Sequence, residues 1–345
     1  APRGSAFLSR GLSEALKVGE PNRVARALCT EATSLTARER DGERRAKEVL
    51  EGARSLIERL NAPLLDGHVR LANALVAFGA HRLGECAAQC RDAERVFRDN
   101  CDDVAWEVTT AQTYQLVSLA FMVRYRELEQ KLAACLRETE ERGDVWGHTS
   151  FLSVGAFSLK LARNLPNEAA EDVREAMSRW KSSDEAFHFQ HFLGLVASVT
   201  IDLYRDNDAA LSQLDERWPK LAEKGFLQAR FARSTLHEMR GRALILSARK
   251  RRDASLLKHA DADAKVLFRD GSGAAEGLGR LLRANIAALR GQAKRAAEEL
   301  RHGLPLFAGL AVTFALVASA ATLGGGWVAH ANEYGRRIAL AVLAL

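Results

Sequence analysis

Two histidines, His188 and His191, stand three residues apart in a segment rich in phenylalanine. On a helix, side chains at this spacing share a face, so both rings could reach one metal ion, with Glu185 as a third ligand. A closed metal site needs a fourth ligand, and the segment offers none. The neighbouring phenylalanines favour packing between helices, with a polar contact in a binding groove as the alternative. The sequence therefore predicts no metal site here.

Cysteine is the next residue type that could do chemistry, and the chain has five of them. Cys86 and Cys90 lie on successive turns of one predicted helix, where they could form a redox or metal-binding pair. The chain has no C-x-x-C motif, and free cysteines are often small core residues. We therefore expect both thiols to pack in the core, without disulfides, in a reduced cytoplasmic setting.

Motifs for nucleotide chemistry and nucleophilic catalysis are missing from the sequence. The glycines around Gly271-Ser272-Gly273 do not have the spacing of a dinucleotide-binding loop, and no strand precedes them, so we expect an interhelical turn. There is no G-x-x-x-x-G-K-[ST] phosphate loop and no H-R-D or D-F-G element of a protein kinase. No Ser/His/Asp or Cys/His set can be assembled from spacing. The sequence predicts a chain that is not an enzyme and holds no cofactor.

Positive charge is the one feature that points toward nucleic acid. Fifty Lys and Arg against forty-four Asp and Glu give a net charge of +6 and a pI near 9.2. Four cations are adjacent in Arg249-Lys250-Arg251-Arg252, which could attract phosphate. A solvated turn after a helix explains the same cluster, because cations are favoured at helix C-termini. A nucleic-acid-associated regulator is therefore kept as the alternative function.

The elements that position these residues are helices. Residues 43–60 have apolar side chains at steps of three and four, with charged residues between them, as expected for an amphipathic helix. Only six prolines occur in 345 residues, and no segment alternates as a strand would. The sequence predicts an all-α protein.

Short breaks divide the chain into helices of about fifteen to twenty residues. The breaks include Gly19-Glu20-Pro21, Asn61-Ala62-Pro63, Gly143-Asp144 and Asn164-Leu165-Pro166, each with a residue that tolerates a left-handed backbone or opens a helix. Pro219 is expected to split or kink the helix that begins near Asn207. Connections this short favour antiparallel neighbours, so the predicted unit is a helical hairpin.

One pattern of residues recurs in the second helix of several hairpins. It is a small residue, followed four positions later by an aliphatic residue or cysteine and three positions after that by another small residue. Clear copies begin at Ala46, Cys86, Ala169 and Ala296, and weaker copies begin near Leu128, Ala210 and Ala254. The spacing is about 41 residues, and short side chains allow helices to pack closely. We therefore expect a TPR-like right-handed α-solenoid of about seven helical hairpins over residues 1–303.

The order of several segments carries a family resemblance that covers about residues 5–303. The segments are Glu14-Ala15-Leu16-Lys17, Val104-Ala105-Trp106-Glu107, Glu141-Arg142-Gly143-Asp144, Phe187-His188-Phe189-Gln190-His191, Ile201-Asp202-Leu203-Tyr204 and Glu216-Arg217-Trp218-Pro219. In these the chain resembles the C-terminal helical-repeat region of large multidomain bacterial serine/threonine protein kinases that carry a STAND-type ATPase module. The resemblance implies a sensing or partner-binding region downstream of both catalytic modules, and we expect a piece of a longer polypeptide.

These observations together predict a non-catalytic regulatory module that binds a protein, a peptide or a small ligand, or the upstream domains of its own polypeptide. The concave face of such a solenoid is normally lined by the first helices of the hairpins. On that basis the predicted partner-binding residues are His68, Gln112, His148, His188 and His191.

Residues 304–345 depart from the pattern of the family. No formally charged residue occurs between His302 and Asn332, and residues 304–323 are long enough to span a bilayer. The segment is rich in Ala, Ser, Thr and Gly, so it is only moderately apolar. We expect a buried terminal hairpin, with a membrane segment or an irregular tail as the alternatives.

Overall fold

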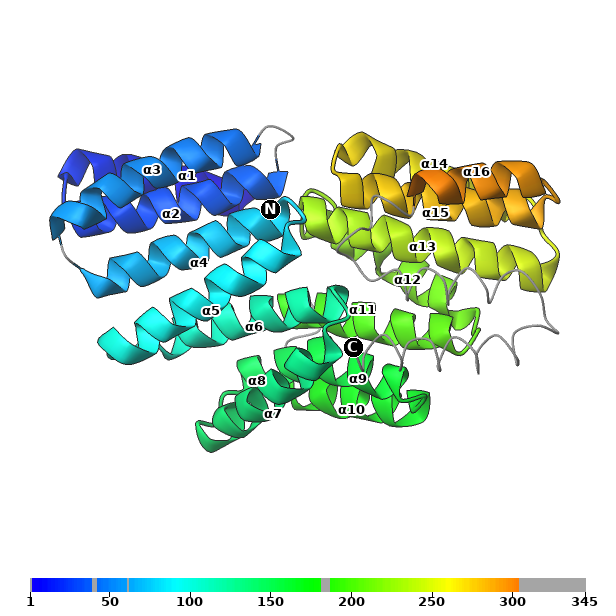
Figure 1. The fold of residues 1–345 in the computed structure, drawn as a ribbon, viewed down its shortest axis with the longest axis horizontal. Coiled ribbons are helices and arrows are strands. Elements are labelled where there is room, and N and C mark those ends of the chain that lie inside the picture. The colour runs from blue at the N-terminus through cyan, green and yellow to red at the C-terminus, as the bar shows by residue number, and fades with distance from the viewer. Residues whose placement is uncertain (1, 39–41, 61, 181–186, 304–345) are drawn as a thin grey trace. The chain divides into compact units, whose positions relative to one another are not determined.

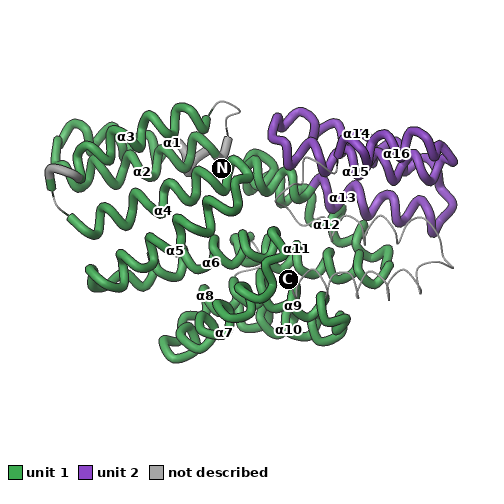
Figure 2. The backbone as a smooth tube through the Cα atoms, viewed as in Figure 1, with its two compact units in different colours: residues 1–236 green, residues 237–345 purple. Residues whose placement is uncertain are grey.

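The computed structural model describes residues 2–38, 42–60, 62–180 and 187–303, and every regular element in these ranges is a helix (Figure 1). The chain divides into two compact units, Ala1–Leu236 and His237–Leu345, which are coloured separately in Figure 2. The prediction of an all-α protein is therefore confirmed for the described residues.

The first unit contains most of the helices. In chain order they are α1 (Pro2–Val18), α2 (Pro21–Arg38), α3 (Gly42–Leu60), α4 (Pro63–Gly79), α5 (Leu83–Asn100), α6 (Ala105–Phe121), α7 (Tyr125–Glu141), α8 (Val145–Phe151), the π-helix η1 (Leu152–Ala156), α9 (Phe157–Ala162), α10 (Pro166–Arg179), α11 (Phe189–Tyr204) and α12 (Ala209–Glu223). Helix α13 (Arg230–Arg251) contains the boundary between the units, and the second unit continues with α14 (Leu256–Asp270), α15 (Gly273–Leu289) and α16 (Ala293–Gly303).

Consecutive helices pack as pairs. Within the first unit α2 contacts α3, α4 contacts α5, α6 contacts α7, and α11 contacts α12, while α15 contacts α16 in the second unit. Helix α8 likewise packs with α10, and α2, α4, α6, α8 and α11, each the earlier helix of its pair, also contact one another in this order. We call these five the first helices. Their mutual contacts bring residues about forty positions apart side by side.

The predicted breaks end the helices for local reasons. Pro63 and Pro166 each occupy the first turn of a helix, where the missing N–H costs nothing. Gly143 and Asn164 adopt positive φ values of 65° and 59°, in the left-handed region where a helix stops. Pro219 does not split the helix, since α12 continues through this residue, and a kink there stays a prediction.

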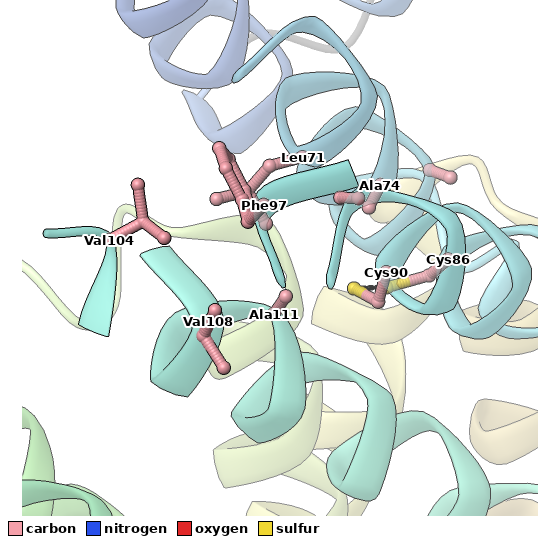
Figure 3. Packing of buried hydrophobic residues seen from close by; sticks show 10 residues of the cluster. Leu71, Ala74, Cys86, Cys90, Phe97, Val104, Val108 and Ala111 are labelled. Carbon is pink, nitrogen blue, oxygen red and sulfur yellow. Dashed lines mark hydrogen bonds between the residues drawn. The ribbon is translucent and has the colours of Figure 1, made fainter. Parts of the chain in front are cut away.

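Small side chains in the second helices are buried where the pairs meet. Ala46, Cys86 and Ala169 have no exposed surface. Figure 3 shows the cluster around Phe97, in which Cys86 and Cys90 of α5 pack beside residues from α4 and α6. For the copy predicted near Ala254, the structure shows that Ala254 itself is exposed and precedes α14, while Ala260 and Ala264 of this helix are fully buried.

The predicted division after residue 303 concerns residues that lie outside the described ranges. Residues 304–345 are among them, so the expected terminal hairpin and the possible membrane segment stay predictions. Among the helices that the structure describes, none combines the length and apolar character needed to cross a bilayer.

Candidate partner-binding face of the first helices

One stripe of side chains runs along each of α4 and α6 at steps of three, four and seven residues, which places its members on one face of the helix. On α4 it comprises Leu64, His68, Leu75 and Phe78, and on α6 it comprises Trp106, Thr110, Tyr114 and Phe121. Phe78 and Tyr114 meet across the two helices with ring centroids 5.0 Å apart. We call the two stripes, together with Val145 and Trp146 at the start of α8, the first-helix face.

One end of this face is covered by the chain itself. Phe231, from the same unit, packs against Phe78 at 4.0 Å and against Phe121 at 5.2 Å between ring centroids. Burial raises the pKa of Tyr114 to about 12, in keeping with its place in this aromatic cluster. Phe121 nevertheless stays 36% exposed at this end, and the opposite end of the face, at the helix N-termini, carries the more exposed ring of Trp106.

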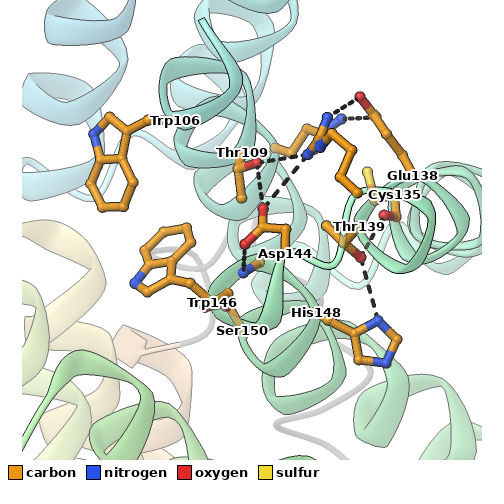
Figure 4. Close-up of polar contacts among 12 residues, drawn as sticks. Trp106, Thr109, Cys135, Glu138, Thr139, Asp144, Trp146, His148 and Ser150 are labelled. Carbon is orange, nitrogen blue, oxygen red and sulfur yellow. Dashed lines mark hydrogen bonds and ion pairs between the residues drawn. The ribbon is translucent and has the colours of Figure 1, made fainter.

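The exposed end carries two tryptophans. Trp106, near the N-terminus of α6, is 61% exposed, and its ring centroid lies 4.8 Å from that of Trp146 on α8. The two rings are inclined by 48°, so they form an open angle rather than a stack. Figure 4 shows the pair beside the polar contacts that connect α6 to α8. Large exposed aromatic surface of this kind is uncommon unless something binds to it.

Asp144 fixes the start of α8 against α6. Its carboxylate accepts hydrogen bonds from the Gly147 backbone N–H at 2.8 Å and from the Thr109 hydroxyl at 3.0 Å. The first bond caps α8, and the second joins two neighbouring first helices. The Arg142 guanidinium lies 3.6 Å from Asp144 and donates to the Thr109 hydroxyl. These bonds fix the position of the first turn of α8, which carries Trp146.

A second polar network lies behind the face, between α5, α6 and α7. Gln112, which is 1% exposed, donates to Glu94 at 3.0 Å and to Glu138 at 3.1 Å. Burial alone would raise the pKa of Glu138, but hydrogen bonds from Arg98 and Gln112 and the charges of Arg98 and Arg142 lower it to about 2. The network therefore holds the Glu138 carboxylate in the ionised form.

The predicted binding residues fall into three situations. His68 lies on the first-helix face, where Nδ1 is 2.7 Å from the Leu64 carbonyl oxygen and Nε2 is 3.5 Å from the Glu107 carboxylate. Gln112 is inside the protein, where it has no surface to offer a partner. His148 is two residues from Trp146 on α8, with Nδ1 3.4 Å from the Thr139 hydroxyl, so it faces α7. Only His68 of these three belongs to the face.

His188 and His191 adopt different roles at the start of α11. The helix begins at Phe189, so His188 is its N-cap residue rather than a helical neighbour of His191. The His188 backbone N–H donates to His191 Nδ1 at 2.9 Å, which occupies one ring nitrogen. Burial and then the charge of His188 lower the pKa of His191. The prediction that His188 and His191 share one face of a helix is therefore wrong, because His188 precedes the helix. Glu185, the third ligand considered, lies outside the described residues.

Other candidate sites have structural explanations. Cys86 and Cys90 are completely buried with sulfurs 3.9 Å apart, and the hydrogen bond to Cys86 together with burial raises the pKa of Cys90. Gly271 ends α14 in a left-handed conformation, and Ser272 caps α15 by accepting from the Ala275 N–H, as expected for a turn. Within the described residues no group of three or more His, Cys, Asp or Glu side chains could hold a metal ion.

The basic cluster lies at the end of α13. Arg249, Lys250 and Arg251 form its last turn, and Arg252 follows with a φ of 54°. Positive charge at this position is favourable because the C-terminal end of a helix carries partial negative charge.

Sequence patterns did not single out Trp106 or Trp146 as candidate binding residues. Trp106 is part of a segment that carries the family resemblance, and Gly143-Asp144, just before Trp146, is a predicted helix break. The sequence signal that could have identified the two tryptophans is their position along the helix, because each is the second residue of a first helix. Their exposure could be recognised only after α4, α6 and α8 were placed side by side.

No protein-family model matches the chain, and comparison with curated proteins gives no significant match.

Proposed function

We propose that this chain is a non-catalytic module that binds a protein or peptide through its first helices and so regulates a larger signalling protein. The observation that carries the proposal is the exposed Trp106 ring, with the half-buried Trp146 beside it, on a face held by the hydrogen bonds of Asp144. Tryptophan is enriched among residues that dominate protein–protein binding energy. Support that fixes a binding surface before the partner arrives reduces the entropy lost on binding.

The architecture behind this proposal is a TPR-like right-handed solenoid of about seven hairpins with a period near 41 residues. The packed pairs α2–α3, α4–α5, α6–α7, α11–α12 and α15–α16 support it. The bond between His237 of α13 and Asp263 of α14 adds a further pair. Contacts between successive first helices are what a stack of hairpins requires, and in such a stack the first helices line the concave face.

The regulatory part of the proposal rests on the resemblance to the helical-repeat region of bacterial kinases with a STAND-type ATPase module. A partner that contacts several hairpins would favour one curvature of the stack. It would thereby shift the population of docked arrangements of the attached catalytic domains. In this proposal the chain itself transfers no phosphate and hydrolyses no nucleotide.

A peptide-display selection on the immobilised chain tests the proposal. We expect selected peptides to lose about tenfold or more in affinity when Trp106 is replaced by alanine. The matched control is Phe7→Ala, which removes an equally exposed aromatic ring (73% exposed) from α1. Selected peptides that bind both variants as well as the wild type, or ATP hydrolysis by the purified chain, would contradict the proposal.

A further inference from the structure

The exposed end of the first-helix face has a local charge opposite to that of the whole chain. Residues 101–123 contain three carboxylates, Asp102, Asp103 and Glu107, and no Lys, Arg or His, although the chain as a whole has a net charge of +6. Burial and then the charges of Asp102 and Glu107 raise the pKa of Cys101, which is consistent with carboxylates gathered at the start of α6.

Two of these carboxylates make no polar contact among the described residues, although the positive φ of 57° at Asp103 is itself a backbone conformation that suits an aspartate. Val104 is the N-cap of α6, and no side chain caps this helix. Asp102 and Asp103 are both exposed, and neither makes a hydrogen bond or ion pair within the described part of the chain. Glu107 differs, because it lies 3.5 Å from His68.

Two guanidinium groups on the neighbouring helices α5 and α7 are already paired with other carboxylates. Arg98 binds Glu94 at 3.1 Å and Glu138 at 2.6 Å. Arg142 binds Glu138 and lies 3.6 Å from Asp144. The start of α6 therefore combines the exposed indole of Trp106 with two nearby residues in sequence, Asp102 and Asp103, whose carboxylates have no ion-pair partner among the described residues.

Indole rings and carboxylates are together suited to one class of ligand group, an organic cation. A guanidinium or ammonium group is attracted to the face of an indole ring, and tryptophan is the best of the aromatic residues for this contact. Arginine adds planar stacking and paired hydrogen bonds to carboxylates. The open angle between Trp106 and Trp146 leaves ring surface available for such a group.

We infer that the Trp106–Trp146 surface, with Asp102 and Asp103 at its rim, docks a cationic, arginine-containing segment of a protein partner. This inference rests on the proposed function and specifies the chemistry of the partner. An arginine side chain lies against the indole rings, and the rim carboxylates pair with the guanidinium groups of the segment. The Asp144 network keeps α6 and α8 in place for this contact.

The test is calorimetric titration of the full chain with the peptide acetyl-Gly-Arg-Gly-Arg-Gly-amide. Its twin has citrulline at both arginine positions, which keeps the shape of the side chain and removes the charge. We expect the arginine peptide to bind about tenfold or more tightly than the citrulline peptide. Raising the salt concentration should weaken the arginine peptide alone, because exposed charges are screened.

Variants locate the site. Trp106→Ala is expected to weaken the arginine peptide about tenfold, and the double variant Asp102→Asn with Asp103→Asn about three- to tenfold with a flatter salt dependence. The matched controls, Phe7→Ala and the double variant Glu48→Gln with Glu51→Gln on α3, should bind as the wild type does. Circular dichroism of each variant verifies that the helices are intact.

Equal affinity for the arginine and citrulline peptides would overturn the inference, as would arginine binding that is unchanged by Trp106→Ala. Dimerisation of the chain that Trp106→Ala abolishes would overturn it too, since the occupant would then be a second copy. Selected peptides that require Trp106 but lack Arg and Lys would overturn the cationic partner and leave the proposed function standing. Selected peptides that never depend on the first-helix face would overturn the proposed function itself.

Discussion

The hydroxyl of Thr109 donates a hydrogen bond of 3.0 Å to the carboxylate of Asp144, thirty-five residues further along the chain. This bond connects α6 to the capped end of α8 and so joins the helices that carry Trp106 and Trp146. The candidate face around the two tryptophans therefore depends on a few polar contacts (Figure 4).

Two substitutions of Asp144 distinguish the hydrogen bond by which it caps α8 from the contribution of its negative charge. We expect Asp144→Ala to lower the free energy of unfolding by about 1–2 kcal/mol, since it removes the cap of α8. Asp144→Asn keeps an acceptor for the Gly147 N–H and should cost less than half as much. Urea denaturation followed by circular dichroism measures both. Equal losses for the two variants would show that capping is not what Asp144 contributes.

Glu138 should make stability depend on pH in the acid range. Its pKa is lowered to about 2 in the folded protein, so its stabilising contribution is present above the unfolded pKa of about 4.3 and is lost as pH falls toward 2. We expect Glu138→Gln to cost about 2 kcal/mol at pH 7, with the difference from wild type shrinking below pH 4.5.

The matched control for this variant is Glu141→Gln, three residues away on an exposed position of the same helix. It should change stability by less than about 0.5 kcal/mol at any pH. A Glu138→Gln difference that stayed constant from pH 7 to pH 2.5 would contradict the assigned role of this carboxylate.

Gly147 permits the close approach of α8 to its neighbours. A Cβ atom there would lie 2.7 Å from Asp144 Oδ2 and 2.7 Å from the Thr109 methyl carbon. Gly147→Ala is therefore expected to destabilise the protein by about 1–3 kcal/mol. Gly52 on α3 is the contrasting position, since a Cβ atom there meets nothing within 4 Å, and Gly52→Ala should stabilise by about 0.5–1 kcal/mol. Thermal unfolding of the two variants should shift in opposite directions.

Sequence patterns predicted the helices well because apolar spacing and breakers act locally. Ala46 and Cys86 are buried as their register predicts. Ala254 shows the limit of register from sequence, because α14 begins two residues later and its fully buried small residues are Ala260 and Ala264. Pro219 shows that a proline need not end a helix, since α12 continues through it.

The candidate site was predicted less well, because exposure depends on neighbours distant in sequence. The polar side chain of Gln112 would suit a binding groove, yet it is buried and hydrogen-bonded to carboxylates of α5 and α7. His188 became a cap residue because α11 begins one residue later than the spacing of the histidines suggests. A tryptophan such as Trp106 would by its size be expected in the core. Its exposure is apparent only once α4 and α8 are placed beside α6.

The second unit contains a buried carboxylate that ties α13 to α14. Asp263 is 3% exposed, and its Oδ1 accepts from His237 Nδ1 at 2.6 Å, with Arg240 at 3.7 Å. Asp263→Ala would leave the half-buried His237 and Arg240 without this carboxylate, at a cost of about 2–3 kcal/mol.

Asp261, two residues earlier, pairs with Lys265 and Arg283 at a more exposed position. Asp261→Ala should therefore cost no more than about 1 kcal/mol. Guanidinium denaturation of the full chain compares the two variants, and similar losses would contradict a buried structural role for Asp263.

Fluorine NMR of the chain labelled with 5-fluorotryptophan tests the binding face most directly, with resonances assigned by single Trp→Phe variants. On addition of a selected peptide, we predict that the Trp106 and Trp146 resonances shift and that those of Trp180 and Trp218 stay within their linewidths. Shifts confined to Trp180 or Trp218, with Trp106 and Trp146 unmoved at saturating peptide, would contradict the account.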